Sequence, residues 1–157
     1  MDRLLDERHA ALQSTWKARL ERWGWQVWVE VSFNRFGDRG RIDLLAWHPT
    51  HRILLVVEVK TEIADAQALL GGIDVKVRVA PHLSGSLGLS APRAVVPLLL
   101  VSEGTTERGR IRRLEPLFSR FTQRGRQAGA WLRRPDARVA TGLLIFTESP
   151  FANGRSV

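Results

Sequence analysis

The chain has 157 residues, of which 44% are hydrophobic, and this is enough apolar material for the core of one domain. It carries 24 Lys and Arg residues against 16 Asp and Glu residues, and the formal net charge of +8 favours polyanionic partners. The absence of cysteine excludes disulfides and thiolate zinc sites, and no apolar run approaches the roughly 18 residues of a membrane-spanning helix.

The N-terminus lacks the basic start and continuous apolar core of a secretory signal. We therefore expect a soluble chain without membrane contact and, by default, a cytoplasmic location. One domain is expected over residues 1–148, followed by a frayed tail at residues 149–157.

Apolar periodicity predicts the elements of the N-terminal half. Helical spacing over residues 2–22 predicts a helix that ends at a Trp-Gly pair. Alternation predicts a strand over residues 25–34, and two β-rich runs at residues 41–48 and 52–60 predict a hairpin. Residues 62–80 fit both a helix and a strand, and we favour the helix.

A stretch rich in Gly and Ser at residues 81–92 predicts a loop, and the apolar run at residues 94–101 predicts another strand. Three further elements, two helices and then a strand, are marked by apolar residues at 114–121, 128–132 and 143–146. This order of elements predicts an α/β sandwich around a mixed sheet.

The predicted hairpin carries charged residues where apolar ones are expected, at Asp43, Glu58 and Lys60. Both of its strands are apolar on both faces, which indicates burial. A turn centred on Pro49-Thr50 would place Asp43 opposite Val56, with Glu58 on the diagonal. Since side chains alternate along a strand, all three charged groups are then expected on one face of the sheet.

A third acid is suggested by the first strand. Pairing across residues 35–40 would place Ser32 opposite Asp43 and Glu30 on the same face. Two carboxylates and an ammonium in a buried sheet are costly unless they bind one another or a metal. Oxygen ligands suit Mg²⁺ or Mn²⁺, and a salt bridge between Lys60 and either acid is the alternative.

The pattern Gly37-x-x-Gly40-x-Ile42-Asp43, followed by Glu58-Val59-Lys60, resembles the PD-(D/E)xK nuclease superfamily, which includes restriction endonucleases and Holliday-junction resolvases. The resemblance covers roughly residues 1–80. It implies a restriction endonuclease-like three-layer sandwich, with a mixed central β-sheet flanked by helices. Asp43 and Glu58 would be metal ligands, and Lys60 would be the catalytic base or the group that orients the attacking water. Ile42 stands where the family name has Pro.

The resemblance implies further site residues. The acid that relatives carry on the first helix has no convincing match, so Glu7 and Glu30 both remain open as a third metal ligand. Gln67, seven residues after Lys60, matches a Gln that many relatives place at the catalytic site; a surface Gln is the alternative.

The implied function is that of a Mg²⁺-dependent endonuclease that hydrolyses the phosphodiester bonds of nucleic acid, with DNA favoured over RNA. The alternative is a catalytically inactive, nuclease-like module that binds nucleic acid or regulates a partner. Many relatives are dimers, so a homodimer is also open.

Arginine is concentrated in the C-terminal third: the segment from Glu107 to Arg134 contains nine Arg residues and only two Glu residues. This segment predicts a phosphate-binding face, with a solvated helical surface as the alternative. The residues expected to bind nucleic acid are Arg39 and Arg41, beside the metal centre, and Arg124, Arg126, Arg133 and Arg134.

Lysine is the exception in this chain, since 21 of the 24 basic residues are Arg. A lysine at position 60 therefore indicates that this position needs a compact ammonium group and not only a positive charge. His48 and His51 flank the predicted hairpin turn, away from Asp43, and His9 and His82 have no evident partner, so we interpret all four as structural or surface residues. The six tryptophans are interpreted as core residues.

Overall fold

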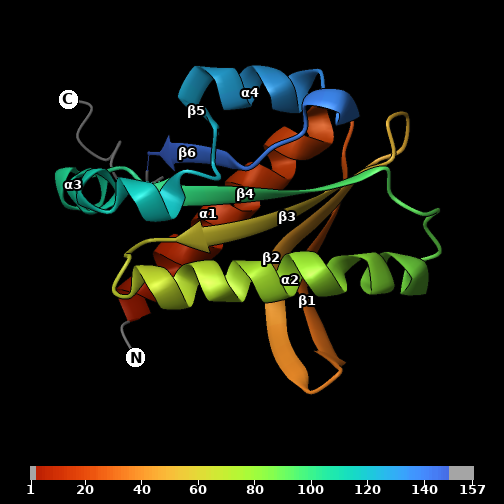
Figure 1. Cartoon of the computed structure of the whole chain (residues 1–157), viewed down its shortest axis with the longest axis horizontal. Coiled ribbons are helices and arrows are strands. Elements are labelled where there is room, and N and C mark those ends of the chain that lie inside the picture. Colours follow the sequence, from red (N-terminus) through yellow and green to blue (C-terminus); the bar gives the residue numbers. More distant parts are fainter. Residues whose placement is uncertain (1–2, 149–157) are drawn as a thin grey trace.

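The computed structural model describes residues 3–148, so the predicted tail at 149–157 lies outside the described part (Figure 1). The helices are α1 (Arg3–Arg22), α2 (Ala66–Ser86), α3 (Thr105–Arg113) and α4 (Gly125–Arg133), with short 3₁₀ turns at Glu115–Phe118 and Ala137–Val139. The strands are β1 (Gln26–Arg35), β2 (Asp38–His48), β3 (Ile53–Lys60), β4 (Ala94–Ser102), β5 (Gln123–Arg124) and β6 (Leu143–Thr147).

The six strands form one mixed sheet in the order β1-β2-β3-β4-β6-β5. β1, β2 and β3 are antiparallel neighbours, whereas β4, β6 and β5 continue the sheet in parallel with β3. In Figure 1, α1 crosses behind the sheet and α2 lies in front of it. The prediction of an α/β fold with a mixed sheet flanked by helices is confirmed.

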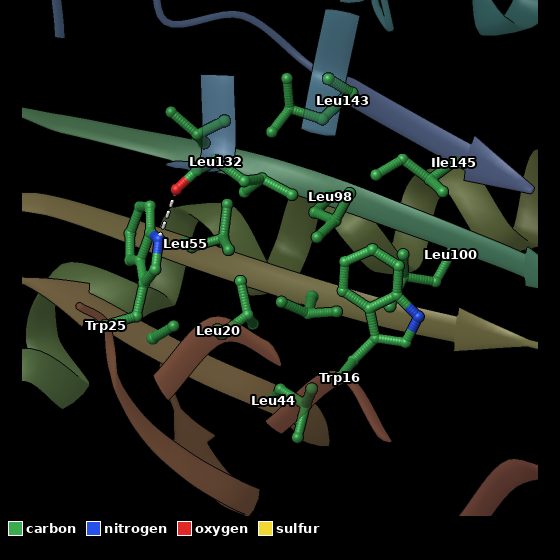
Figure 2. Close-up of a cluster of buried hydrophobic side chains, with 14 of the residues drawn as sticks. Trp16, Leu20, Trp25, Leu44, Leu55, Leu98, Leu100, Leu132, Leu143 and Ile145 are labelled. Atoms are coloured by element: carbon green, nitrogen blue, oxygen red, sulfur yellow. Dashed lines mark hydrogen bonds between the residues drawn. The ribbon is translucent and has the colours of Figure 1, made fainter. Parts of the chain in front are cut away.

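One apolar core lies between the sheet and helices α1 and α4. Trp16 and Leu20 from α1 meet Leu55 and Leu98 from the central strands, as Figure 2 shows. The Trp25 indole Nε1 donates a hydrogen bond of 2.9 Å to the carbonyl of Leu132 at the end of α4. Trp16 and Trp25 are both buried, which confirms their interpretation as core residues.

Helix α2 is longer than predicted and covers the other face of the sheet. It begins after Asp65, whose side chain accepts a hydrogen bond from the Ala68 amide, a standard N-terminal cap. Pro81 lies inside the helix, so the predicted loop over residues 81–92 is wrong for its first six positions. The apolar face of the helix continues to Leu83, and burial of that face holds the helix past a residue that normally ends one.

The hairpin of β2 and β3 has a different register from the predicted one. His48 pairs with Ile53 across a four-residue loop, and Leu44 pairs with Val57. The predicted pairing of Asp43 with Val56 is therefore wrong by two residues. A slip of two residues leaves every side chain on its predicted face, and here it brings Asp43 level with Glu58.

The pairing of β1 with β2 was also predicted wrongly, because the turn is shorter than expected. Phe36 and Gly37 form a two-residue turn with φ values of 54° and 84°. Two positive φ values are what a type I′ hairpin turn requires. Consequently Ser32 pairs with Arg41, not with Asp43.

The C-terminal third departs most from the predicted elements. The segment predicted as a helix at 114–121 contains only the 3₁₀ turn, whereas α3 precedes it and was not predicted. The helix and strand predicted at 128–132 and 143–146 are confirmed as α4 and β6. Among residues 3–148, no helix combines the length and apolar character needed to cross a membrane.

Candidate active site

Asp43 lies one residue before Leu44, the first residue of β2 that pairs with β3. Its carboxylate accepts a hydrogen bond of 2.8 Å from the Val59 amide of β3. Its Oδ2 also lies 3.4 Å from Nε2 of His9 on α1, and the side chain is only 13% exposed. The carboxylate is therefore held between two strands and the helix behind them.

Glu58 is the second acid of the site, and its side chain is 8% exposed. Its Oε2 lies 2.6 Å from Nζ of Lys76 on α2, and its Oε1 lies 3.8 Å from Nζ of Lys60. Burial raises the pKa of Glu58, the charge of Asp43 raises it further, and the Lys76 ammonium opposes both effects. The site therefore places a second carboxylate close enough to disfavour the ionised form of Glu58.

Lys60 is the last residue of β3 and lies on the same side of the strand as Glu58, as strand alternation predicts. Its side chain is 39% exposed, whereas that of Lys76 is 15% exposed. The more exposed ammonium is thus the one free to meet a substrate. The more buried ammonium, that of Lys76, is bound to Glu58.

Lys76 is a site residue that the sequence reasoning missed. It follows Ile73 by three residues and precedes Ala80 by four, and both of these residues are buried. Helical geometry places Lys76 between them on the apolar face of α2. A lysine on that face, in a chain with so few lysines, was the available signal, but the ambiguity between helix and strand over residues 62–80 concealed it.

His9 was also missed, and its interpretation as a residue without a partner is wrong. The hydrogen bond to Asp43 raises the pKa of His9, against the opposing effect of burial. His48 packs against Trp25 and His51, and His82 packs against Phe36. These three histidines contact neither acid of the site in the described structure.

A cleft of about 350 Å³ opens beside the two lysines. It is bounded by the end of β3, the connection from β3 to α2 and the first turns of α2. Gly72 forms part of its wall, and a Cβ at that position would meet open space. The cleft gives a ligand access to Glu58 and Lys60 from solvent.

The predicted third acid does not join this cluster. Glu30 lies 3.4 Å from Arg41 on the exposed side of the hairpin, and Glu7 is exposed on α1. Gln67 is exposed on the first turn of α2 and does not line the cleft. Within residues 3–148, no three His, Asp or Glu side chains converge as a ready metal cluster.

The donor set nevertheless fits a hard divalent cation. Mg²⁺ is commonly bound through one or two carboxylates and keeps several water ligands. Asp43 and Glu58 supply two carboxylates that are nearly buried and repel each other, and a cation between them would remove that repulsion.

The predicted arginines do not form one surface. Arg124 pairs with Glu115 at 2.7 Å and donates to the carbonyls of Phe118 and Phe121, so it holds the local chain together. The remaining predicted arginines are exposed and lie in three places: Arg126 and Arg133 along α4, Arg134 beside the His48 and His51 end of the sheet, and Arg39 and Arg41 on β2.

Comparison with known proteins adds no further constraint to this geometry. A scan against protein-family models and a search of curated proteins each found no match to the chain.

Proposed function

We propose that the chain is a Mg²⁺-dependent nuclease that hydrolyses phosphodiester bonds of nucleic acid, with DNA as the favoured substrate. The observation that carries the proposal is the pair formed by Asp43 and Glu58, two nearly buried carboxylates, of which Glu58 lines a solvent-accessible cleft. Burying two neighbouring carboxylates lowers the stability of the fold, so the pair indicates a functional role. Binding of a divalent cation is the role that suits its chemistry.

Each side chain has a role that follows from its contacts. Asp43 and Glu58 would hold the Mg²⁺ ion, which supplies positive charge against the negative charge that grows on the phosphodiester during attack. Lys60 orients the attacking water from the open side of the cleft. Lys76 keeps Glu58 in place, and His9 does the same for Asp43.

A second function is favoured by one specific contact. The ammonium of Lys76 lies 2.6 Å from Glu58 and partly neutralises it without a metal. A nuclease-like module that binds nucleic acid without cutting it would need no more than this ion pair. Metal binding and turnover separate the two functions.

The test combines calorimetric titration with Mg²⁺ or Mn²⁺ and cleavage assays on duplex DNA, single-stranded DNA and RNA. The nuclease predicts metal-dependent cleavage that falls by several orders of magnitude in Asp43→Asn and Glu58→Gln. Asp136→Asn and Glu21→Gln are matched controls, because both residues are remote from the cleft.

Binding of metal and nucleic acid without cleavage would support the second function instead. Wild-type turnover in purified Asp43→Asn or Glu58→Gln would contradict the assigned centre. No metal binding at all would leave the cluster as a structural ion pair.

A further inference from the structure

A second pocket, of about 530 Å³, lies between α1, α4 and the end of β6. We call it the arginine–indole pocket, after the residues that give it its chemistry: Arg19, Arg126, Arg133, Trp16 and Trp23. Its volume falls within the range of roughly 300–1,000 Å³ that is usual for small-molecule sites. None of its lining residues belongs to the catalytic cluster.

The three arginines of this pocket have no carboxylate partner within residues 3–148, in contrast to Arg108, Arg120 and Arg124. Two of them are nevertheless held in place by contacts with tryptophan rings. The guanidinium of Arg19 lies 5.0 Å from the Trp16 ring centre, and that of Arg133 lies 5.2 Å from that of Trp23.

An arginine held over an indole ring keeps its N–H donors available for an anion. Because its side chain is already restrained, less conformational entropy is lost when a phosphate binds. Three arginines, two of them restrained in this way, with no acid among the lining residues give the pocket a preference for anions.

The pocket also has aromatic and apolar walls. Trp23 is only partly buried, and Trp16 donates from Nε1 to the Thr147 hydroxyl at 3.1 Å, which ties α1 to the end of β6. Gly129 of α4 forms another wall, where a Cβ would meet no atom within 4 Å. Positive charge next to an indole and open space suits a ligand with both a phosphate and a flat ring.

The position of the pocket relates it to the cleft. In the sheet, Lys60 pairs with Val101, and Val101 pairs with Phe146, a residue of the pocket. The ends of β3 and β6 are therefore two strand spacings apart, roughly 10 Å. The cleft lies on the α2 side of the sheet and the pocket on the α1 and α4 side, so a nucleic-acid strand that reached both sites would pass over this end of the sheet.

We propose that the arginine–indole pocket binds one unpaired nucleotide of a single-stranded nucleic acid, with the phosphate on the arginines and the base against Trp23. The choice of nucleic acid as the ligand rests on the proposed function. Duplex DNA does not offer an exposed base face, so the pocket selects a single strand or the unpaired end of a duplex.

The test measures binding of a short fluorescein-labelled oligothymidylate, and of the same strand with abasic positions, in a buffer containing EDTA so that nothing is cut. Gly129→Leu fills the pocket without removing charge and introduces a better helix former, so folding is expected to persist. We expect affinity for the intact strand to fall on the order of tenfold or more, and affinity for the abasic strand to fall less.

Gly109→Leu is the matched control, since it lies on α3, outside the pocket, and also has open space at its Cβ. A second pair of variants tests the cations. Arg126→Gln with Arg133→Gln should weaken binding more than Arg112→Gln with Arg113→Gln, which removes the same charge from the exposed end of α3.

Wild-type affinity in Gly129→Leu, or equal losses in the two arginine pairs, would overturn the pocket assignment. These outcomes are independent of catalysis. A chain that binds the strand here but cuts nothing would contradict the nuclease and leave the pocket. A chain that cuts nucleic acid while Gly129→Leu binds normally would contradict only the pocket.

Discussion

Two lysines approach one carboxylate, and their surroundings differ. Lys76 is nearly buried and lies 2.6 Å from Glu58, whereas Lys60 is more exposed and lies 3.8 Å away. A buried ammonium in direct contact stabilises the ionised acid. An exposed ammonium at longer range remains available to water and substrate. Lys76 therefore has the structural role, and Lys60 has the proposed chemical role.

Lys60→Arg tests whether charge alone is sufficient at the edge of the cleft. A guanidinium is bulkier than an ammonium and does not release a proton, so we expect cleavage to fall on the order of 10²-fold or more, nearly as far as in Lys60→Ala. Single-turnover cleavage at saturating Mg²⁺ and several pH values measures the effect.

Lys17→Arg is the matched control, because this lysine pairs with Glu21 on the exposed side of α1. A Lys60→Arg rate within a few-fold of wild type would refute a role in handling protons. It would leave the metal site standing.

Lys76→Met removes the close partner of a buried acid. We expect the free energy of unfolding to fall by about 3 kcal/mol without metal, because buried Glu58 loses its close partner and keeps only the more distant and more exposed Lys60. Mg²⁺ should restore part of the loss by binding the folded state. Urea unfolding with and without Mg²⁺ measures both effects, and Glu58→Gln combined with Lys76→Met should recover stability but not respond to Mg²⁺.

Stability unchanged by Lys76→Met would show that the ion pair contributes nothing to the fold. A loss that Mg²⁺ does not reduce would argue against metal binding at Glu58.

His48 gives a pH dependence with a defined sign. Burial lowers its pKa from the ordinary value near 6.5, and the neighbouring His51 lowers it further. The unfolded chain then binds the proton more readily, so stability is full above about pH 6.5 and declines as the pH falls towards the folded-state pKa. His48→Asn should flatten this decline in thermal unfolding between pH 7 and 5.

His82→Asn, which removes a histidine at a different place on the surface, is the control. An unchanged acid decline in His48→Asn would show that other groups cause it.

At the scale of the elements, α2 both covers the sheet and carries Lys76 to the site. Pro81 interrupts it, because a proline has no amide hydrogen to donate to the preceding turn. Packing of the apolar face maintains the helix on both sides of Pro81. The position of Lys76, a little more than one turn earlier, therefore depends on a helix that is weakened locally.

Pro81→Ala should raise the free energy of unfolding by about 1 kcal/mol, because it restores a helix donor and a better helix former. Pro92→Ala, in the loop before β4, is the comparison, where loss of the ring's restraint on the unfolded chain predicts a small decrease instead. Thermal and urea unfolding provide both values. A decrease with Pro81→Ala would indicate that the ring itself packs productively.

For the whole molecule, the positive charge is divided between arginines that hold the fold together and arginines that are free for a ligand. The net charge of +8 predicts an affinity for nucleic acid that falls steeply with salt. Replacing Arg126, Arg133 and Arg134 with Gln should flatten the log–log salt slope by roughly 0.7 to 0.9 for each arginine that contacts a phosphate.

Adding Arg124→Gln to these replacements should change the slope little and lower the melting temperature, since Arg124 is bound to Glu115 and to two carbonyls. Affinity measured over a salt series, together with thermal unfolding, separates the two effects. A slope unchanged by all four replacements would show that nucleic acid binds elsewhere.

The sequence by itself determined the α/β class and the shared face of Glu58 and Lys60. Both follow from local periodicity, since side chains in a strand alternate whatever lies beside them. Asp43 also lies near enough to Glu58 to raise its pKa, although the predicted register was wrong by two residues. Local patterns thus identified the hairpin on which the proposed chemistry depends.

Only the tertiary structure decided which other groups meet these acids. His9 approaches Asp43 from α1 on one side of the sheet, and Lys76 approaches Glu58 from α2 on the other. Periodicity shows which face of a helix is buried, but not which residue of another element it meets, because that depends on loop lengths and helix packing. For the same reason, only the folded chain separated Arg124, which is bound to Glu115, from Arg133, which lies free over Trp23.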